Sequence, residues 1–250
     1  MDLGLGNRLA LVLGASSGLG RGVALTLAQE GARVALASRS AERLAPVAEA
    51  IGEAAEPFTA DTGDLDRMAT LVPEVEAALG PVDVLVLNTG GPPPGMAMDN
   101  SAEEWEAAFR SLVLAPRLLI EATLPGMRER GWGRIVNVSS SSIREPILGL
   151  ALSNANRMAA LGLLNTLARE VAGDGVTVNT IATGKFATPR LASNYGSLEE
   201  AERVAADEVP AGRLGTPEEY GDLVAFVCSD RARYLTGTVI PLDGGLTRSS

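Results

Sequence analysis

Short apolar runs rich in Val, Leu and Ile alternate along this chain with longer segments of helical hydrophobic period. The five runs are RLALVLG from Arg8, ARVALAS from Ala32, VDVLVLN from Val82, GRIVNVS from Gly133 and GVTVNTIA from Gly175. Runs that are apolar at almost every position are typical of parallel strands buried on both faces. The alternation therefore predicts an α/β protein with a doubly wound parallel sheet, in which right-handed connections place helices on both faces as three α/β/α layers.

The segments between the runs carry the helical pattern, at residues 20–30, 41–52, 64–79, 102–130 and 151–172. Two stretches break the rhythm, GPPPG at 91–95 and the segment 185–209, and each follows a predicted strand. Ligand-binding loops of doubly wound sheets lie at the carboxyl ends of the strands. We therefore expect the functional site there, with residues 185–209 as the substrate loop.

Composition limits the classes of partner. The 250 residues can form one domain, residues 1–250, around a single core. A net charge of −10 makes nucleic acid an unfavourable partner. With one cysteine, Cys228, and no histidine, the chain has neither an internal disulfide nor the usual zinc ligands, and we expect no metal. No apolar run reaches membrane-spanning length, so we expect a cytoplasmic protein without a membrane partner.

The segment LVLGASSGLG, residues 11–20, passes from the first predicted strand into the first predicted helix. Its glycines permit a tight turn and close approach of the backbone, and the helix N-terminus offers free N–H groups and a positive dipole end to a pyrophosphate. The alternative is a merely tight strand-to-helix turn. Six residues of this turn are candidate cofactor contacts: Gly14, Ser16, Ser17, Gly18, Leu19 and Gly20.

The second predicted strand ends at Ser38 and Arg39. An acidic residue there would bind the 2′-hydroxyl of an adenosine ribose. An arginine can instead donate two parallel hydrogen bonds to a 2′-phosphate, and a serine can add a hydroxyl donor. This pair predicts NADP(H) as the cofactor. The alternative is that Arg39 caps the next helix or lies on its surface and binds no cofactor.

Five segments together resemble the short-chain dehydrogenase/reductase family over essentially the whole chain. They are LVLGASSGLG at 11–20, LNTG at 87–90, NVSS at 137–140, VTVNTIATG at 176–184 and LDGG at 242–245. LAREV at 167–171 and GRLGTPEE at 212–219 are similar to the 3-oxoacyl-acyl-carrier-protein reductase-like group. The resemblance implies a Rossmann-type fold, a nicotinamide cofactor, a small carbonyl or alcohol substrate, and a homotetramer or homodimer.

The resemblance also implies cofactor contacts outside the glycine turn. Asp61, in TADT, would lie near the adenine. Asn88 and Gly90 would line the cofactor, and Thr188, after Gly184, would reach the nicotinamide end.

The family's catalytic signature is an Asn, a Ser, and a Tyr-x-x-x-Lys on one helix. The matching positions here are Ser111, Ser140, Ser153 and Arg157, so only the Ser, at Ser140, is kept. The three tyrosines all lie beyond that segment, at Tyr195, Tyr220 and Tyr234.

This replacement affects the proton step. Hydride transfer to a carbonyl leaves an alkoxide that needs a proton, which a Tyr with a pKa of about 10 can supply when a cation is near. Ser153 is a far weaker acid than a Tyr. The alternative is that Ser153 has no role in the reaction and only caps the helix. Arg157, one helical turn further along, can orient a group or stabilise negative charge but does not readily pass protons on. We expect Arg157 to have a partner, either Glu145 or a phosphate or carboxylate of the ligand.

Two residues of the predicted substrate loop are candidates for the missing acid. Lys185, the only lysine, could act as acid or base if burial lowers its pKa, and Tyr195 could swing inward as a donor. A solvated loop lysine and a lid aromatic are the alternatives. The apolar residues near these loops suggest a hydrophobic substrate pocket or part of the core: Leu148, Leu150, Phe186 and Leu191.

Three functions remain open at this point. The first is an NADP(H)-dependent oxidoreductase with an altered proton donor, and the second is a nucleotide-binding protein without redox turnover. The third is a non-redox lyase resembling the halohydrin dehalogenases, which carry Arg in place of Lys. Those enzymes keep the Tyr and lose the glycine-rich loop, the reverse of this sequence, so we rank the lyase last.

Overall fold

The computed structural model describes residues 1–249 and contains a seven-stranded parallel sheet with the strand order β3-β2-β1-β4-β5-β6-β7. The strands are β1 (Leu9–Leu13), β2 (Arg33–Ser38), β3 (Ala55–Thr59), β4 (Val84–Leu87), β5 (Gly133–Val138), β6 (Val176–Thr183) and β7 (Val239–Leu242). The strand order reverses between β1 and β4, and ligands of doubly wound sheets bind outside the carboxyl ends of the strands at such a switch point. The predicted Rossmann-type α/β fold is confirmed.

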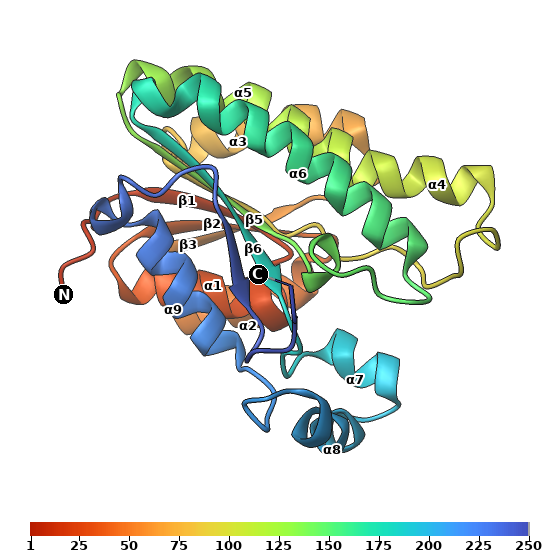
Figure 1. Cartoon of the computed structure of the whole chain (residues 1–250). Coiled ribbons are helices and arrows are strands. Elements are labelled where there is room, and N and C mark those ends of the chain that lie inside the picture. The colour runs from red at the N-terminus through yellow and green to blue at the C-terminus, as the bar shows by residue number, and fades with distance from the viewer. Residues whose placement is uncertain (250) are drawn as a thin grey trace.

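Helices cover both faces of the sheet, as Figure 1 shows. They are α1 (Gly18–Gln29), α2 (Ala41–Ile51), α3 (Leu65–Leu79), α4 (Ala102–Phe109), α5 (Ala115–Glu129), α6 (Ala151–Val171), α7 (Pro189–Tyr195), α8 (Leu198–Glu208) and α9 (Pro217–Cys228). In Figure 1, α3, α5 and α6 lie on one face and α1, α2 and α9 on the other, while α7 and α8 lie beyond the end of β6. None of these helices is long and apolar enough to cross a membrane.

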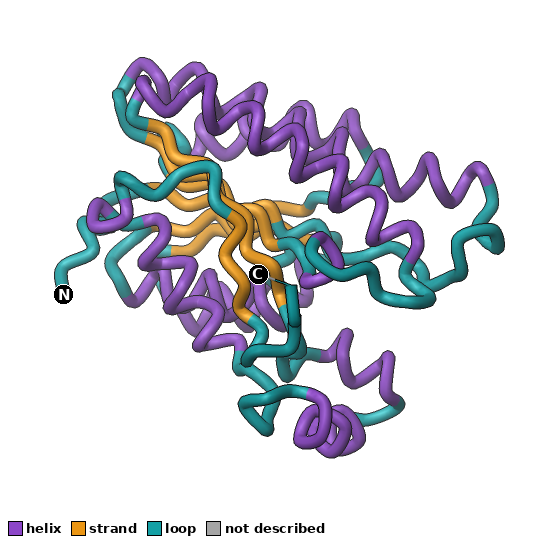
Figure 2. Tube along the Cα trace, viewed as in Figure 1, coloured by secondary structure: helices purple, strands orange, loops and turns teal. Residues whose placement is uncertain are grey.

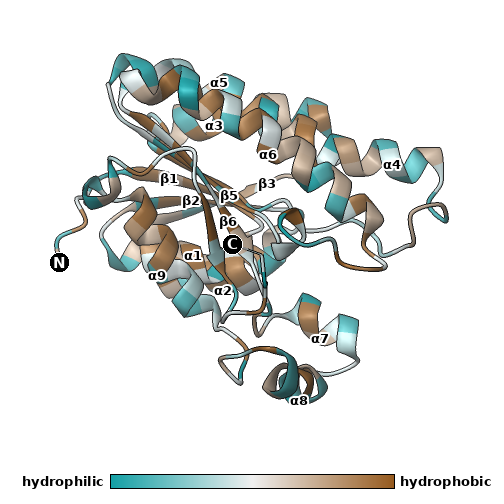
Figure 3. Ribbon diagram, in the orientation of Figure 1, coloured by the Kyte–Doolittle hydropathy of each residue, from teal (hydrophilic) through white to brown (hydrophobic). Residues whose placement is uncertain are grey.

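The period of two along the strands divides the core between the two faces. In β1, Leu11 points into the cluster under α3, α5 and α6, whereas Val12 points into the cluster under α1, α2 and α9. Both side chains are fully buried, and burial of such a side chain stabilises the fold by about 1.5–3 kcal/mol. The central strands β1 and β4 are therefore apolar along their length, while helices such as α9 carry both apolar and polar residues (Figure 3).

The structure contains all five predicted strands. It also contains two strands that were not predicted, β3 and β7. Both are edge strands of the sheet, and each contains a proline, Pro57 or Pro241, which edge strands tolerate because their outer N–H groups need no partner. In β3 only Phe58 is buried. A half-exposed strand with a proline lacks the continuous apolar run that identified the others.

Two predicted segments differ from the structure. The predicted helix at 102–130 is α4 and α5 joined by a π-helical turn, Arg110–Leu114. The predicted substrate loop at 185–209 contains α7 and α8.

The segment at 91–95 is irregular, and its Gly95 N–H donates to Gly149 O at 2.7 Å. The loops after β4, β5 and β6 gather at the carboxyl edge of the sheet (Figure 2). Ser250, the last residue of the predicted domain, lies outside the described residues.

Candidate functional site

The turn between β1 and α1 has the geometry that its glycines allow. Gly14 has φ +62° and Gly18 has φ +54°, a region that favours glycine. A Cβ on Gly20 would lie 2.2 Å from the carbonyl oxygen of Gly14, and one on Gly14 would lie 2.7 Å from Nδ2 of Asn88. The absence of side chains at these positions brings the first turn of α1, the end of β1 and Asn88 into contact.

The first turn of α1 keeps its N–H groups free of side-chain caps. Ser17 is the N-cap residue, with extended backbone and no side-chain cap bond. In contrast, Ser40 and Asp64 cap α2 and α3 by accepting from backbone N–H groups. The free first-turn N–H groups are the donors that a pyrophosphate would need. Ser16 is half-buried beside Ser17, and Leu19 packs against the core under α1.

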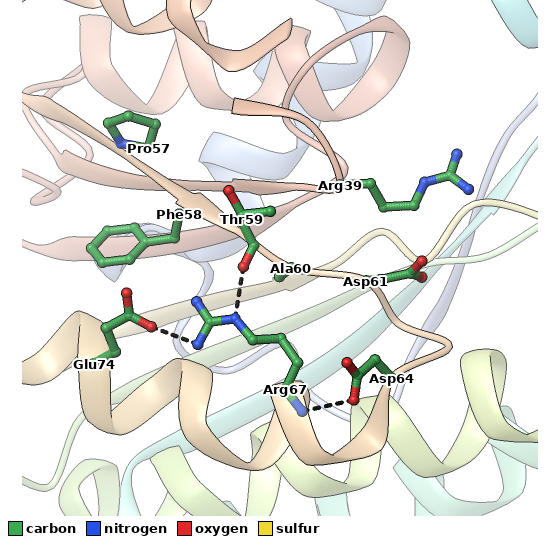
Figure 4. Close-up of a pocket in the computed structure, with 9 residues that line it drawn as sticks. All are labelled: Arg39, Pro57, Phe58, Thr59, Ala60, Asp61, Asp64, Arg67 and Glu74. Atoms are coloured by element: carbon green, nitrogen blue, oxygen red, sulfur yellow. Dashed lines mark hydrogen bonds and ion pairs between the residues drawn. The ribbon is translucent and has the colours of Figure 1, made fainter. Parts of the chain in front are cut away.

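An open pocket of about 510 Å³ lies at the ends of β2 and β3. Figure 4 shows Arg39 and Asp61 extending from these strand ends in the same direction. Arg67 instead turns back, donating to Thr59 O at 2.7 Å and pairing with Glu74. In residues 1–249, Arg39 has neither a hydrogen bond nor an ion pair, so its guanidinium is available to an anionic ligand.

Ser38 and Asp61, the other two residues predicted near the adenosine end of the cofactor, form hydrogen bonds to backbone groups. Ser38 is buried, and its hydroxyl donates to Ser40 O at 3.2 Å. One carboxylate oxygen of Asp61 accepts from Gly63 N at 3.0 Å in the loop before α3. Asp61 is therefore oriented by its own loop, and Ser38 contributes to the shape of the turn after β2.

The predicted cofactor contacts near the switch point lie in the loops that follow β4 and β6. Thr188 is the N-cap of α7, and its methyl group would lie 3.2 Å from a Cβ on Gly18. Gly90 follows β4 with φ +77°. A Cβ on Gly184 would lie 2.5 Å from Cα of Asp243, so this glycine allows β6 and the end of the chain to approach closely. The structure thus brings Thr188 next to the glycine turn.

Arg157 is the most densely bonded side chain of the site. Its Nε donates to the Ser153 hydroxyl at 3.0 Å, its Nη1 to Val138 O at 3.1 Å and its Nη2 to Gly90 O at 2.6 Å. Burial, with repulsion from Arg190, lowers the pKa of Arg157 to about 10, although Tyr220 opposes the shift. The expected partner Glu145 is wrong, because its carboxylate accepts from the backbone at the end of the chain instead.

Ser153 is buried in the first turn of α6, but it does not cap the helix, whose N-cap is Leu150. Ser140 accepts from Ser142 N at 3.1 Å as the N-cap of a short 3₁₀ turn. Both hydroxyls accept a hydrogen bond and keep their O–H to donate. Ser111, which was matched from the sequence to the family's Asn, lies in the π-helical turn and donates to Ala108 O at 3.3 Å.

Lys185 points away from the glycine turn, toward α7 and α8. Its ammonium group pairs with Glu208 and lies 5.3 Å from the Tyr195 ring centroid. Burial lowers the pKa of Lys185, but the bonds to Glu208 and Tyr195 outweigh burial and raise it. The condition under which Lys185 could act as the acid, a pKa lowered by burial, is therefore not met. Both side chains connect the helices of the loop to the end of β6.

The four apolar residues do not form one pocket. Leu148 is 90% exposed, whereas Phe186 is buried with its ring edge-to-face against Tyr220. Leu191 packs with α8 in a small separate cluster, and Leu150 forms an isolated bridge to Gly95. The expectation of a hydrophobic pocket built from these residues is not met, and only Phe186 is part of the core.

Two residues near the site were not predicted. Arg190, in α7, donates to Gly91 O at 3.0 Å and to Pro92 O at 3.1 Å. Tyr220, fully buried in α9, shares a hydrogen bond of 3.0 Å with the hydroxyl of Thr183 at the end of β6. Only their contacts across the fold bring them here, and no local motif marks either one. Within residues 1–249, no group of three acidic or cysteine side chains is placed to hold a metal ion.

Comparisons with known proteins cover almost the whole chain. The profile of a family described as enoyl-(acyl carrier protein) reductase matches residues 14–247. Nodulation protein G of Azospirillum brasilense is 33% identical over 248 residues, 97% of this chain and 99% of that protein. The 3-oxoacyl-acyl-carrier-protein reductase FabG of Thermotoga maritima is 32% identical over 245 residues, 97% of this chain and 98% of that protein.

Solved structures with bound nucleotide are similar over the same extent. L-sorbose reductase from Gluconobacter frateurii, complexed with NADPH and L-sorbose, has a TM-score of 0.95 and 30% identity and covers 100% of both chains. A 3-oxoacyl (acyl-carrier-protein) reductase from Agrobacterium tumefaciens with NADP bound has a TM-score of 0.91 and 29% identity, covering 98% of this chain and 96% of that one.

Proposed function

Because the chain belongs to the short-chain dehydrogenase/reductase family, we propose that it is an NADP(H)-dependent oxidoreductase of a ketone or a secondary alcohol. The observation that carries the choice of cofactor is the Arg39 guanidinium, which lines the pocket together with Asp61 and has no protein partner within residues 1–249. An arginine at the end of the second strand provides two parallel donors for a 2′-phosphate, and an acidic residue there would repel it.

The residues present fit a dinucleotide. A Cβ on Gly20 would occupy the space beside Gly14 O, and α1 begins without a side-chain cap, so the turn can cradle a pyrophosphate. Thr188 and Asn88 flank this turn. When bound, the nicotinamide would supply or accept the hydride. The chain's own residues must bind the carbonyl oxygen and stabilise the charge that develops on it.

We propose that Ser153 and Ser140 donate hydrogen bonds to that oxygen. The Ser153 hydroxyl accepts from Arg157 and therefore directs its own proton elsewhere, and Ser140 has the same freedom. The positive charge of Arg157 stabilises the alkoxide through Ser153, and the alkoxide takes its proton from solvent to give the alcohol. Donors aimed at a developing oxyanion contribute about 2.7–4 kcal/mol each in known enzymes.

A nucleotide-binding protein without redox turnover is the second candidate. It is favoured by one observation: three N–H groups of Arg157 bond to Ser153 and to two backbone carbonyls, as in a purely structural contact. We retain three further proposals from the sequence, namely residues 185–209 as the substrate loop, a small carbonyl or alcohol substrate, and a homotetramer or homodimer.

Oxidation of NADPH in the presence of a panel of ketones and aldehydes separates the two candidates. The oxidoreductase proposal predicts that at least one carbonyl accelerates loss of NADPH absorbance in wild type and that Ser153→Ala slows it. The matched control is Thr166→Val, which removes a hydroxyl that donates to Gly162 O within the same helix, α6. NADPH binding without any carbonyl-dependent oxidation would favour the second candidate.

A further inference from the structure

Two guanidinium groups meet at the loop that follows β4. Arg157, from α6, donates to Gly90 O at 2.6 Å. Arg190, from α7, donates to the next two carbonyl groups, Gly91 O at 3.0 Å and Pro92 O at 3.1 Å. Three successive carbonyl groups therefore hold two arginines from different helices at one place.

This contact depends on a glycine. A Cβ on Gly91 would lie 2.7 Å from Nη2 of Arg190. The bare backbone at Gly91 thus allows the guanidinium to lie flat against the loop. The two positive charges also repel each other, and repulsion from Arg190 contributes to the lowered pKa of Arg157.

No carboxylate offsets these two charges in the part of the chain that the structure describes. Acidic residues outnumber basic ones by 31 to 21, and other arginines of the chain, such as Arg130 and Arg213, pair with carboxylates. Arg157 and Arg190 have only neutral partners. Backbone carbonyls offset the charge of the half-buried Arg157 only in part, and the exposed Arg190 adds a second positive charge next to it, so a bound anion would be stabilised there.

Both guanidinium groups keep donors for such an anion. Each has five N–H groups, of which three are used in Arg157 and two in Arg190. The planar fork of a guanidinium matches two oxygens of a carboxylate or phosphate. Ser153, bonded to Arg157, adds a hydroxyl beside the same group.

We propose that Arg157 and Arg190 form a subsite for an oxyanion, a carboxylate or phosphate group, between α6, α7 and the loop after β4. The group belongs either to the substrate, which is then an acidic ketone or alcohol, or to a phosphate of the cofactor. The inference rests on the proposed function for the source of the anion, but the binding of an anion by the two arginines does not require turnover.

Equilibrium titrations with a matched pair of probes test this subsite. Acetoacetate and acetoacetamide have the same shape and differ in charge. Their affinities are measured by NMR, with arginine side-chain Nε–H shifts as the readout, for wild type alone and for wild type saturated with NADP⁺. The variants are Arg190→Met and the control Arg203→Met, since Arg203 lies in α8 and pairs with Glu200.

The proposal predicts that wild type binds acetoacetate roughly tenfold more tightly than acetoacetamide, as expected for charge-assisted bonds. Arg190→Met abolishes the preference and Arg203→Met retains it. Equal affinities for the two probes in wild type, or an undiminished preference in Arg190→Met, would overturn the proposal. Arg157→Gln is the second variant: its amide nitrogen takes the place of the arginine Nε and can still donate to Ser153, but the guanidinium is lost, so the preference should fall. Circular dichroism checks its folding.

The titrations with NADP⁺ identify the source of the anion. A preference that persists with NADP⁺ bound assigns the subsite to the substrate. A preference that disappears with NADP⁺ bound, together with weaker NADP⁺ binding by Arg190→Met, assigns it to a cofactor phosphate. If wild type does not bind NADP⁺ at all but prefers acetoacetate, the proposed function fails and the subsite stands.

Discussion

The Nε of Arg157 donates to the hydroxyl of Ser153 at 3.0 Å, from one turn of α6 to the turn before it. In the match proposed from the sequence, these are the positions of the family's Tyr-x-x-x-Lys. The pair combines a weak acid with a cation that does not readily release its proton, so we propose that it orients and stabilises a bound group rather than relaying protons.

Ser153→Ala therefore tests whether the hydroxyl acts on the reacting oxygen. We expect the kcat for carbonyl reduction to fall by about a hundredfold or more because one donor to the developing oxyanion is lost. The Kd for NADPH, measured by calorimetry, should change little. An unchanged kcat, or a loss equal to that of Thr166→Val, would remove Ser153 from the reaction.

The double substitution Ser153→Tyr with Arg157→Lys restores the family pattern. We expect kcat to rise above that of wild type, because a Tyr with its pKa of about 10 lowered by a nearby ammonium is a far better acid than Ser. Steady-state rates across pH provide the measurement. The double variant should show a new titration in its rate profile, and a rate below wild type in a folded protein would contradict the expectation.

Gly20→Ala tests the glycine turn. Its Cβ would lie 2.2 Å from Gly14 O, so the turn must shift, and we expect the NADPH affinity to fall by roughly tenfold or more along with the unfolding temperature. The matched control is Gly162→Ala in α6, where a Cβ would meet nothing within 4 Å. That change should stabilise the protein by about 0.4–1 kcal/mol without affecting NADPH binding.

Lys185→Met tests the contact between the end of β6 and α8. Because Glu208 is exposed and solvent screens the pair, we expect a loss of less than about 1 kcal/mol in the free energy of urea unfolding. The folded pKa of Lys185 is raised, so this contribution is fully present below the unfolded pKa of about 10.4 and is lost as pH rises through the folded value. A difference that varies between about pH 6 and 9 would contradict this assignment.

The central strands and the glycine turn could be predicted because their signals are local. Continuous apolar runs mark strands such as β1 and β4, and Gly14, Gly18 and Gly20 mark the turn. The edge strands could not be predicted in the same way, because Pro57 and Pro241 interrupt runs that are only partly buried.

The site was predictable as a set of positions but not as a set of contacts. Arg157 was expected to have a partner, yet its acceptors are backbone carbonyls of Gly90 and Val138, 67 and 19 residues away. The direction of Lys185 depends on α8, which the sequence pattern presented as a loop. Backbone acceptors and long-range pairs have no residue-type signature, so packing alone reveals them.

The most direct test of the account is a calorimetric titration with NADPH, NADP⁺, NADH and NAD⁺ of wild type, Arg39→Asp and the control Arg169→Asp. The proposal predicts tight binding of the NADP forms by wild type and by the control. Arg39→Asp should weaken NADPH binding by about tenfold or more, and NADH binding much less, because it loses the fork on the 2′-phosphate. Equal effects on both nucleotides would contradict the role of Arg39, and no binding of any nucleotide by wild type would contradict the proposed function itself.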